Sequence, residues 1–129
     1  MSRLFLLPLV IILVFHLVCA TSLEVAMHVI SGVPDNPTKL RVHCTSRQSR
    51  TSDLGMRTLN HGQEFGWSFS YDTDFYVCKF YWGSKTDSVD VYGERIQPFC
   101  GSVCYLAAKP DGFYVGHDKN SWYKIQDWK

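Results

Sequence analysis

The chain has 129 residues, with 13 Lys and Arg against 12 Asp and Glu, which gives a formal net charge of +1. This balance disfavours a nucleic-acid-binding function, because such proteins normally gather an excess of basic residues on one face. The length fits one domain with a modest core, and we therefore expect neither a second domain nor an internal linker.

Residues 1–20 have the three parts of a secretory signal peptide. Arg3 supplies the positive start, Leu4 to Val18 forms an apolar run, and Val18-Cys19-Ala20 offers a cleavage site after Ala20. Cleavage after Ser22 is the second choice. A membrane anchor is the weaker interpretation, because the run is shorter than the roughly 20 apolar residues of a spanning helix. We therefore predict a secreted, extracellular protein whose mature domain spans residues 21–129.

Four cysteines stand in the predicted mature domain: Cys44, Cys78, Cys100 and Cys104. Outside the cell, an even number of cysteines in a small protein indicates disulfides rather than metal or redox chemistry. Three pairings are open at this point. Long closed loops remove more entropy from the unfolded chain than short ones, which favours bonds from both Cys100 and Cys104 back to Cys44 and Cys78.

Strand-forming residues recur along the predicted mature chain, and no helical periodicity accompanies them. The first predicted strand is Leu23–Ile30. In Lys39–Cys44 apolar side chains alternate with basic ones, and in Glu64–Tyr71 aromatic side chains alternate with small or polar ones. Each of these two segments should bury one face and expose the other.

The second half of the chain continues the same pattern in shorter pieces. Asp74–Trp82 is almost entirely apolar or aromatic, as in a strand covered on both faces. Further strands are predicted at Val89–Tyr92, Phe99–Ala107, Gly112–Val115 and Ser121–Asp127. Turn-forming residues separate them. This spacing predicts an all-β fold, a single small antiparallel β-sandwich of about seven to eight strands with two disulfides.

The tryptophans are predicted to fill the core rather than to form a binding platform. Trp67, Trp82 and Trp122 lie in segments with strand-like alternation, and aromatic rings fill space in small sandwiches. Trp128 is the expected exception, because it stands next to the last residue of the sequence. We expect its side chain to be exposed.

Neither a metal site nor an enzyme is predicted. The histidines after the leader stand on separate predicted elements, with no His-x-His pair and no i, i+4 pair. His61 with Glu64, or His117 with Asp118, could form acid–base pairs, and a secreted ribonuclease is the strongest enzyme alternative. Both pairs lie in turns, however, where adjacent polar residues are ordinarily solvated. We expect no catalytic residue, no cofactor and no nucleic-acid partner.

Residues spread over almost the whole predicted mature chain match the motifs of one protein family in their order and spacing, so the chain resembles that family. The set comprises His43-Cys44-Thr45-Ser46, Asp53-Leu54-Gly55, Leu59, Gly62, Phe65, Trp67-Ser68-Phe69, Phe75, Cys78, Trp82, Val91-Tyr92, Cys100, Cys104-Tyr105, Asp111-Gly112-Phe113-Tyr114 and Trp122. Each match alone is weak. Together with the predicted signal peptide, they make the chain similar to the plant self-incompatibility protein S1 family.

The resemblance implies a small secreted β-sandwich with two disulfides that acts as an extracellular ligand. The family's founding role is that of a pistil-secreted protein recognised by a receptor on the pollen surface. This recognition triggers calcium signalling and arrests incompatible pollen. Many relatives are S-protein homologues with no assigned task, so a second function stays open: a secreted binding module for a cell-wall glycan or a defence-related signal.

Recognition is expected in three polar segments, because loops can vary without disturbing a stapled core. The segments are residues 47–52, 85–90 and 118–121. The first segment carries two arginines, whereas many members of the family that the chain resembles carry acidic residues there. The candidate recognition residues are Arg47, Gln48, Arg50, Lys85, Asp87, Asp90, Asp118, Lys119 and Asn120. We expect the mature protein to be monomeric and to have no membrane anchor. By the resemblance, its partner is a receptor protein on the pollen surface.

Overall fold

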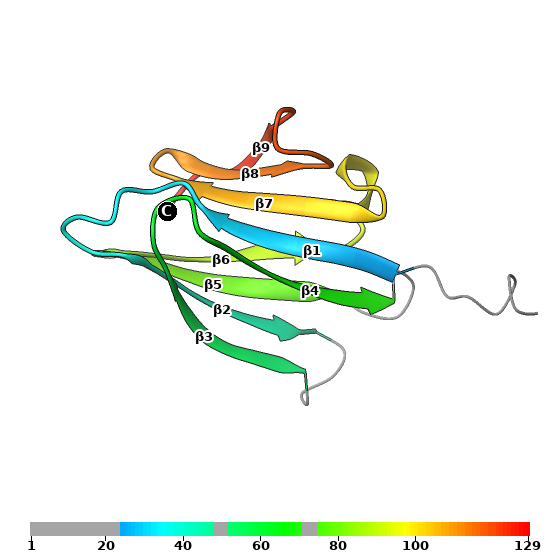
Figure 1. The fold of residues 1–129 in the computed structure, drawn as a ribbon, viewed down its shortest axis with the longest axis horizontal. Helices are drawn as coiled ribbons and strands as arrows, with labels where there is room; N and C mark the ends of the chain where they lie inside the picture. Colours follow the sequence, from blue (N-terminus) through cyan, green and yellow to red (C-terminus); the bar gives the residue numbers. More distant parts are fainter. Residues whose placement is uncertain (1–23, 48–51, 71–74) are drawn as a thin grey trace, which may run out of the picture.

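The computed structural model describes residues 24–47, 52–70 and 75–129. Over these residues the chain forms nine strands in two facing sheets and one short 3-10 helix (Figure 1). The predicted signal peptide and two candidate recognition residues, Gln48 and Arg50, lie outside the described residues. The prediction of an all-β sandwich is confirmed for the described part of the chain.

The five-stranded sheet has the strand order β4-β1-β7-β8-β9. Its strands are β1 (Glu24–Ser31), β4 (Glu64–Ser70), β7 (Val103–Lys109), β8 (Gly112–Gly116) and β9 (Tyr123–Gln126). The four-stranded sheet has the order β3-β2-β5-β6, and its strands are β2 (Leu40–Ser46), β3 (Asp53–Leu59), β5 (Tyr76–Trp82) and β6 (Lys85–Tyr92). The 3-10 helix η1 (Gln97–Phe99) lies in the connection from β6 to β7, which joins the two sheets.

Neighbouring strands pair antiparallel, as predicted, with the exception of β1 and β7. These two strands are parallel, and their register places Ala26 opposite Val103 and Ser31 opposite Ala108. The other edge of β1 pairs with β4, so β1 lies inside the sheet although it is the first strand of the chain. The five-stranded sheet is therefore mixed rather than purely antiparallel.

The largest differences from the predicted strands concern β3, β6 and β7. β3 was not expected, and only Leu59 among its seven residues is buried, so it lacks the alternation of a half-buried strand. The segment 85–90, expected to be a loop, forms most of β6. The strand expected at Phe99–Ala107 begins only at Val103, because η1, which contains Pro98, extends over the predicted start.

Inward-facing side chains of both sheets form one core. Leu40 and Val42 are fully buried, which confirms the one-sided burial predicted for β2. The aromatic residues of β4 also face the core, as predicted. Phe69 is buried, and Phe65 and Trp67 are partly buried against the other core residues.

β5 is covered on one face only, so the prediction of a strand buried on both faces is wrong. Tyr76, Cys78 and Phe80 are buried, whereas Lys79 is exposed and Tyr81 is half-buried. In the described part of the chain, no further layer covers the outer face of the four-stranded sheet (Figure 1). The outward residues of β5 therefore lie at the surface.

Trp128 packs against the core, which corrects the expectation of an exposed side chain. Its ring centroid lies 4.5 Å from that of Phe113 and 6.1 Å from that of Trp82. The indole Nε1 of Trp128 also donates a 2.7 Å hydrogen bond to the carbonyl of Lys109. These contacts hold the residues that follow β9 against the sandwich, and Trp82 fills space as predicted.

The two disulfides join Cys44 to Cys78 and Cys100 to Cys104. The expected pairing, in which Cys100 and Cys104 both bond back to the earlier cysteines, is therefore wrong. Strand register explains the difference: Cys44 of β2 lies directly opposite Cys78 of β5, with both side chains fully buried. Cys100 lies just before β7 and Cys104 is the second residue of that strand, and their Cα atoms are 4.9 Å apart. Loop entropy alone could not reveal either neighbourhood.

Candidate recognition surface

Two of the predicted recognition segments meet at the end of the four-stranded sheet. Arg47 follows β2, and its backbone N–H donates a 2.7 Å hydrogen bond to the carbonyl of Phe75. Nη1 of Arg47 lies 3.5 Å from Oδ1 of Asp90, which belongs to β6 on the far side of β5. Both side chains are more than half exposed. The ion pair therefore bridges two segments that are distant in the sequence.

The third predicted segment forms a tight turn between β8 and β9. Oδ1 of Asp118 accepts the backbone N–H groups of Asn120 and Ser121, both at 2.8 Å. These bonds, led by that from Asn120, lower the pKa of the Asp118 carboxyl below its ordinary value of 3.8, because they stabilise the ionised form. Nε2 of His117 lies 3.2 Å from the other carboxylate oxygen. The turn is thus internally hydrogen-bonded.

Further contacts hold this turn on the five-stranded sheet. Nζ of Lys119 lies 3.1 Å from Glu64 of β4, and the carbonyl of Lys119 accepts a 3.0 Å hydrogen bond from Nε1 of Trp122. Gly116, the last residue of β8, is in close contact with the returning chain. A Cβ atom on Gly116 would collide with the carbonyl oxygen of Ser121 and would lie 2.9 Å from that of Asp118. The turn therefore requires glycine at this position.

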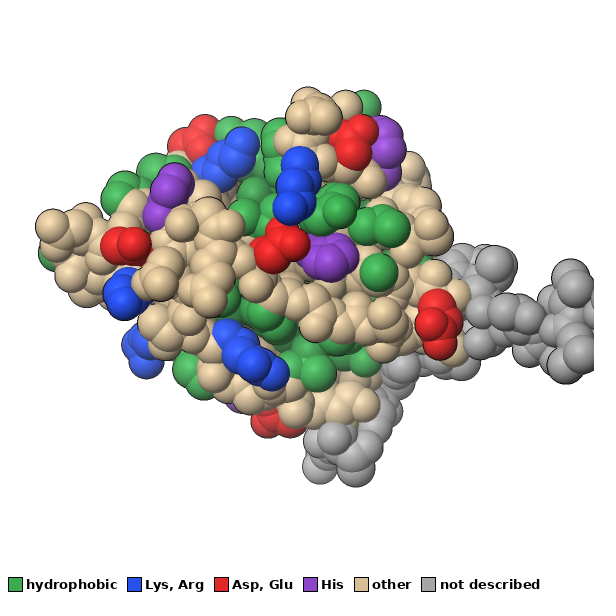
Figure 2. Space-filling model, viewed as in Figure 1, with side chains coloured by type: hydrophobic (Ala, Val, Ile, Leu, Met, Phe, Trp, Pro, Cys, Tyr) green, Lys and Arg blue, Asp and Glu red, His purple; other side chains and the backbone are tan. Residues whose placement is uncertain are grey.

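The sheet surface beside the turn mixes hydrophobic, histidine and charged side chains (Figure 2). The ring of His28 in β1 stacks on that of Tyr105 in β7, with centroids 4.9 Å apart. Nδ1 of His28 also lies 3.7 Å from Glu64, and the ammonium of Lys119 lies 5.5 Å from the centroid of Tyr105. These neighbours link the turn to the two central strands of the sheet.

β2, β6 and β8 all end on the same side of the sandwich, so the Arg47–Asp90 pair and the β8–β9 turn lie at one end of the molecule (Figure 1). The connection from β6 to β7 lies at this end too. We name this end the recognition end and define it by Arg47, Asp90, Gly93–Ser102 and His117–Ser121. The definition takes residues from all three predicted segments, although Asp90 is its only residue from segment 85–90.

Two hollows open at the recognition end, and both use the β6–β7 connection. One hollow of about 220 Å³ is lined by Arg47, Phe75, Asp90 and residues 93–96. The other, of about 250 Å³, is lined by Glu24, Val25, Tyr92, Gln97 and residues 100–102. The first presents both signs of charge to solvent.

Lys85 and Asp87 do not belong to this end. Lys85 starts β6 at the opposite end, where its Nζ lies 3.5 Å from the carbonyl of Pro110. Asp87 is only 6% exposed, so its expected place in a surface loop is wrong. Its carboxylate accepts the backbone N–H groups of Ser88 at 2.9 Å and Lys129 at 3.0 Å. Asp87 therefore fixes the last residues of the chain rather than facing a partner.

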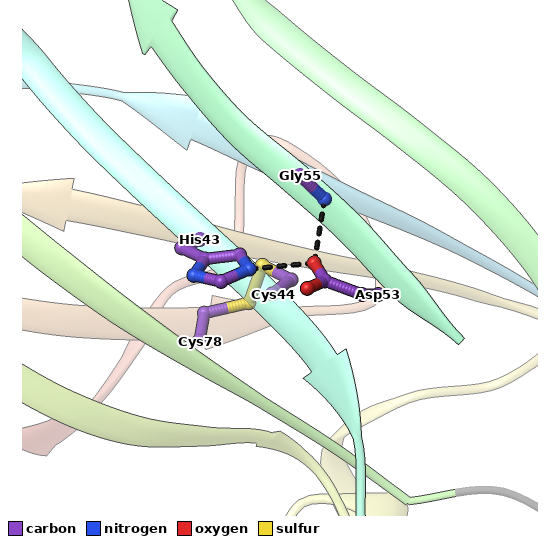
Figure 3. Close-up of a disulfide and its surroundings, with 5 residues drawn as sticks. All are labelled: His43, Cys44, Asp53, Gly55 and Cys78. Atoms are coloured by element: carbon purple, nitrogen blue, oxygen red, sulfur yellow. Dashed lines mark hydrogen bonds and ion pairs between the residues drawn. A yellow bond between two sulfur atoms is a disulfide. The ribbon is translucent and has the colours of Figure 1, made fainter. Parts of the chain in front are cut away.

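The family-motif residues around the first disulfide support the fold (Figure 3). Nε2 of His43 donates a 2.5 Å hydrogen bond to Oδ1 of Asp53, which also accepts the backbone N–H of Gly55 at 2.8 Å. The Gly55 hydrogen bond first, and His43 second, lower the pKa of Asp53 below 3.8. Gly55 has a φ of 77°, a conformation that favours glycine. Leu54 between them packs against the core.

Motif residues at the opposite end shape turns. Gly62, with a φ of 82°, lies in the turn between β3 and β4. The hydroxyl of Tyr114 donates a 2.7 Å hydrogen bond to Asp111. This bond lowers the pKa of Asp111 below 3.8 and raises that of Tyr114 above 10.0. A Cβ atom on Gly112 would collide with the carbonyl of Gln126, so glycine permits the close approach of β9.

The histidines do not converge on one site. His61 contacts Val33 rather than Glu64, donating a 3.0 Å hydrogen bond from Nδ1 to the carbonyl oxygen. The remaining three histidines that the structure describes each contact a carboxylate: His28 contacts Glu64, His43 contacts Asp53 and His117 contacts Asp118. Within the described residues, no group of three or more His, Cys, Asp or Glu side chains could hold a metal ion. The same residues contain no helix long and apolar enough to cross a bilayer.

Comparison with known proteins decides the family. The sequence model described as plant self-incompatibility protein S1 matches residues 26–128, nearly the whole described region. The chain belongs to the plant self-incompatibility protein S1 family. The matched range contains the residues that maintain the first disulfide, the edge strand and the turns.

Relatives of this S1-family protein bear the name S-protein homolog. The chain is 30% identical to S-protein homolog 24 of Arabidopsis thaliana over 93% of this chain and 87% of the relative. It is 39% identical to S-protein homolog 2 of the same plant, over 46% of this chain and 37% of the relative. These names describe members of the same family of small plant proteins.

A solved structure shares the fold. The similarity has a TM-score of 0.61 at 21% identity and covers 84% of this chain and 96% of the other. That structure is described as belonging to the self-incompatibility protein homologues, a widespread family of small, highly stable, secreted proteins from plants. The similarity supports the fold of the described residues, and the words small, highly stable and secreted describe the family of that solved protein.

Proposed function

We propose that this S1-family protein is an extracellular signalling ligand that a receptor protein on another cell recognises through the recognition end. In the most specific form of the proposal, the ligand comes from the pistil, the receptor lies on pollen, and recognition arrests incompatible pollen. Residues 1–20 then act as the signal peptide and residues 21–129 form the mature domain. Family membership supports this assignment.

The observation that carries the proposal is the exposed but internally held turn at His117–Ser121. Two backbone N–H groups bond to Asp118, and Lys119 is paired with Glu64, so the turn has a defined shape before any partner binds. Binding through such a segment loses little conformational entropy. The Arg47–Asp90 pair adds both signs of charge beside a hollow at the same end.

Application of the secreted recombinant protein to pollen of defined genotype tests the proposal. We expect growth arrest for one group of genotypes and normal growth for the others. Exchange of residues 117–121 for those of an allelic relative should change which genotypes respond. Lys85→Ala, at the opposite end of the sandwich, is the control and should change nothing.

Two results would count against the proposal in different ways. Normal growth of pollen of every genotype would contradict the mating role. Arrest that survives both the exchange of residues 117–121 and Arg47→Ala with unchanged specificity would contradict the recognition end. The unfolding temperature of each variant shows whether it is still folded.

The relatives support a second candidate, a defence-related signal outside mating, because both bear the name S-protein homolog and neither name carries a mating role. The recognition end would serve the same purpose with a different receptor. Transcript distribution separates the two: expression confined to the stigma supports the mating ligand, whereas expression in roots or many tissues supports the second candidate.

A further inference from the structure

The outer face of the four-stranded sheet carries a compact group of cationic and aromatic side chains. On β2 and β5 the inward residues are buried, so the alternate residues face outward. The register then places Arg41 opposite Tyr81 and His43 opposite Lys79. We name these four residues the basic block. Lys39, which is exposed and directly precedes β2, extends the row of outward cations.

Two cations of the basic block flank one aromatic ring. The guanidinium of Arg41 lies 5.1 Å and the ammonium of Lys79 lies 5.6 Å from the centroid of Tyr81. Both side chains are exposed. Two like charges near one ring repel each other, and an anion between them would relieve that repulsion.

The nearby carboxylates already have partners, and one of these partners belongs to the basic block. Asp53 bonds to His43, and Asp90 pairs with Arg47 at the end of the sheet. Among the residues that the structure describes, neither Arg41 nor Lys79 has a carboxylate within 4.0 Å. The centre of this face is therefore cationic although the whole chain is nearly neutral.

Hydroxyl groups border the block on both flanking strands. Thr58 of β3 lies opposite Arg41. Thr86 and Ser88 of β6 lie opposite Tyr81 and Lys79. All three hydroxyl residues are exposed. The surface thus combines cations, hydroxyls and one ring, and these groups recognise carboxylates, sugar hydroxyls and the C–H face of a sugar.

We propose that the basic block binds an acidic polysaccharide, a polyuronate whose sugar units carry carboxylates. Cross-strand neighbours lie about 5 Å apart and same-face residues on one strand about 6.7 Å apart, so adjacent cations can bind carboxylates on neighbouring sugars. A bilayer fits the face poorly, because Met56, at 48% exposed, is the large apolar residue that projects from the described part of it. Polyuronates are components of plant cell walls, where a secreted S1-family protein would meet them.

This proposal does not rest on the proposed signalling function. The basic block lies on the face of the sheet, whereas the recognition end lies at the strand ends (Figure 1). Retention by a cell-wall polyuronate and recognition by a receptor would use different residues. Failure of one proposal would leave the other intact.

Titration of the secreted protein with polygalacturonate, followed by NMR and calorimetry, tests the proposal. We expect saturable binding with shifts at Arg41, Lys79 and Tyr81, and loss of binding when the polymer's carboxyls are methyl-esterified. The double variant Arg41→Gln/Lys79→Gln should bind about tenfold more weakly or worse, because two charge-assisted contacts are lost.

The matched control is Lys109→Gln/Lys124→Gln, which removes the same charge from β7 and β9 of the other sheet and should change the affinity less than about twofold. Equal weakening by both double variants would overturn the proposal, since it would indicate a general charge effect. So would absence of binding, equal binding of the esterified polymer, or binding to anionic phospholipid vesicles without binding to polygalacturonate. Thermal unfolding confirms that both variants are folded.

Discussion

Nε2 of His43 lies 2.5 Å from Oδ1 of Asp53, and this contact ties the edge strand β3 to β2. Leu59 is the fully buried residue of β3, and Leu54 is partly buried against the core. The same carboxylate oxygen also accepts the N–H of Gly55, which shapes the start of β3. This polar contact therefore adds to the backbone pairing with β2 and to the packing of Leu54 and Leu59 in holding β3 in place.

The Asp53 carboxylate should titrate below 3.8, and removal of the imidazole should raise its pKa only in part. His43→Gln removes the second contribution, while the larger one, from the N–H of Gly55, remains. Because the folded pKa is lowered, the stabilisation is present above pH 3.8 and is lost as the pH falls through the folded value. Carboxyl NMR titration measures this. An Asp53 pKa of 3.8 in the unaltered protein would contradict it, and Asp118 serves as the unaffected control.

The two disulfides should contribute unequally to the free energy of unfolding. The bond between Cys44 and Cys78 spans 34 residues, whereas that between Cys100 and Cys104 spans 4. Loop entropy predicts a loss of about 4 kcal/mol for Cys44→Ala/Cys78→Ala and about 2 kcal/mol for Cys100→Ala/Cys104→Ala. Denaturant unfolding measures both. Equal losses would contradict the loop-entropy account.

Peptide mapping without reduction checks the pairing itself. Trypsin should release the peptide Val42–Arg47 bonded to Thr58–Lys79, because cleavage sites precede and follow each segment. The peptide that begins at Ile96 should appear separately with an internal bond. A single species that contains all three peptides would show that the long-range pairing is the correct one.

Asp111 and Tyr114 should perturb each other's pKa reciprocally. Tyr114→Phe removes the hydrogen bond that contributes most to the lowered pKa of Asp111, which should rise toward 3.8. Asp111→Ala should return the pKa of Tyr114 toward 10.0. The stabilisation from Asp111 is lost as the pH falls below 3.8, and that from Tyr114 is lost as the pH rises above 10.0.

Carboxyl NMR and phenolate absorbance follow these two titrations. The titration of Asp53, in the other sheet, should be the same in both variants and serves as the control. If Asp111 titrated unchanged in Tyr114→Phe, the hydrogen bond would not be the cause of its lowered pKa.

Gly116→Ala should displace the β8–β9 turn. The added methyl would meet the backbone carbonyls of Ser121 and Asp118, which cannot move without breaking the turn. We expect a loss of about 1–3 kcal/mol in stability and NMR shifts across residues 117–121. Gly93→Ala, where nothing lies within 4 Å of the added atom, is the control and should stay near neutral. Equal effects of the two substitutions would contradict the crowding argument.

Asp87→Ala should loosen the end of the chain and lower stability by about 1–2 kcal/mol, because it leaves two partly buried N–H groups without their acceptor. The affected donors are the backbone N–H groups of Ser88 and Lys129. Asp90→Ala is the matched control, since Asp90 is exposed and its ion pair with Arg47 contributes at most about 1 kcal/mol. Hydrogen exchange at residues 123–129 should rise only in the first variant.

The strands with a regular alternation could be predicted from the sequence, and those without it could not. β2 and β4 alternate because one face of each is buried, and burial requires apolar residues at every second position. β3 is an edge strand with a glycine and exposed polar residues, so its pattern resembles a loop. In β6 the inward Asp87 interrupts the apolar positions, because its partner is a backbone group from the far end of the chain.

The recognition end could be predicted only in parts. The polar turn at residues 118–121 is recognisable from its composition. The ion pair between Arg47 and Asp90 depends on the strand order β2-β5-β6, and this order cannot be read from any local sequence pattern. The disulfide pairing depends on register in the same way, since Cys44 and Cys78 face each other only when β2 and β5 align.

The position of β1 has a consequence for the order in which the molecule can assemble. During synthesis β1 is available long before β7, whose Val103 must lie beside Ala26. Until β4 and β7 arrive, both edges of β1 and its apolar residues Val25, Met27 and Val29 lack their partners. Such late, long-range pairing makes folding slow. In the newly made chain, β1 therefore keeps an unpaired edge until β7 has emerged, and unpaired strand edges favour aggregation.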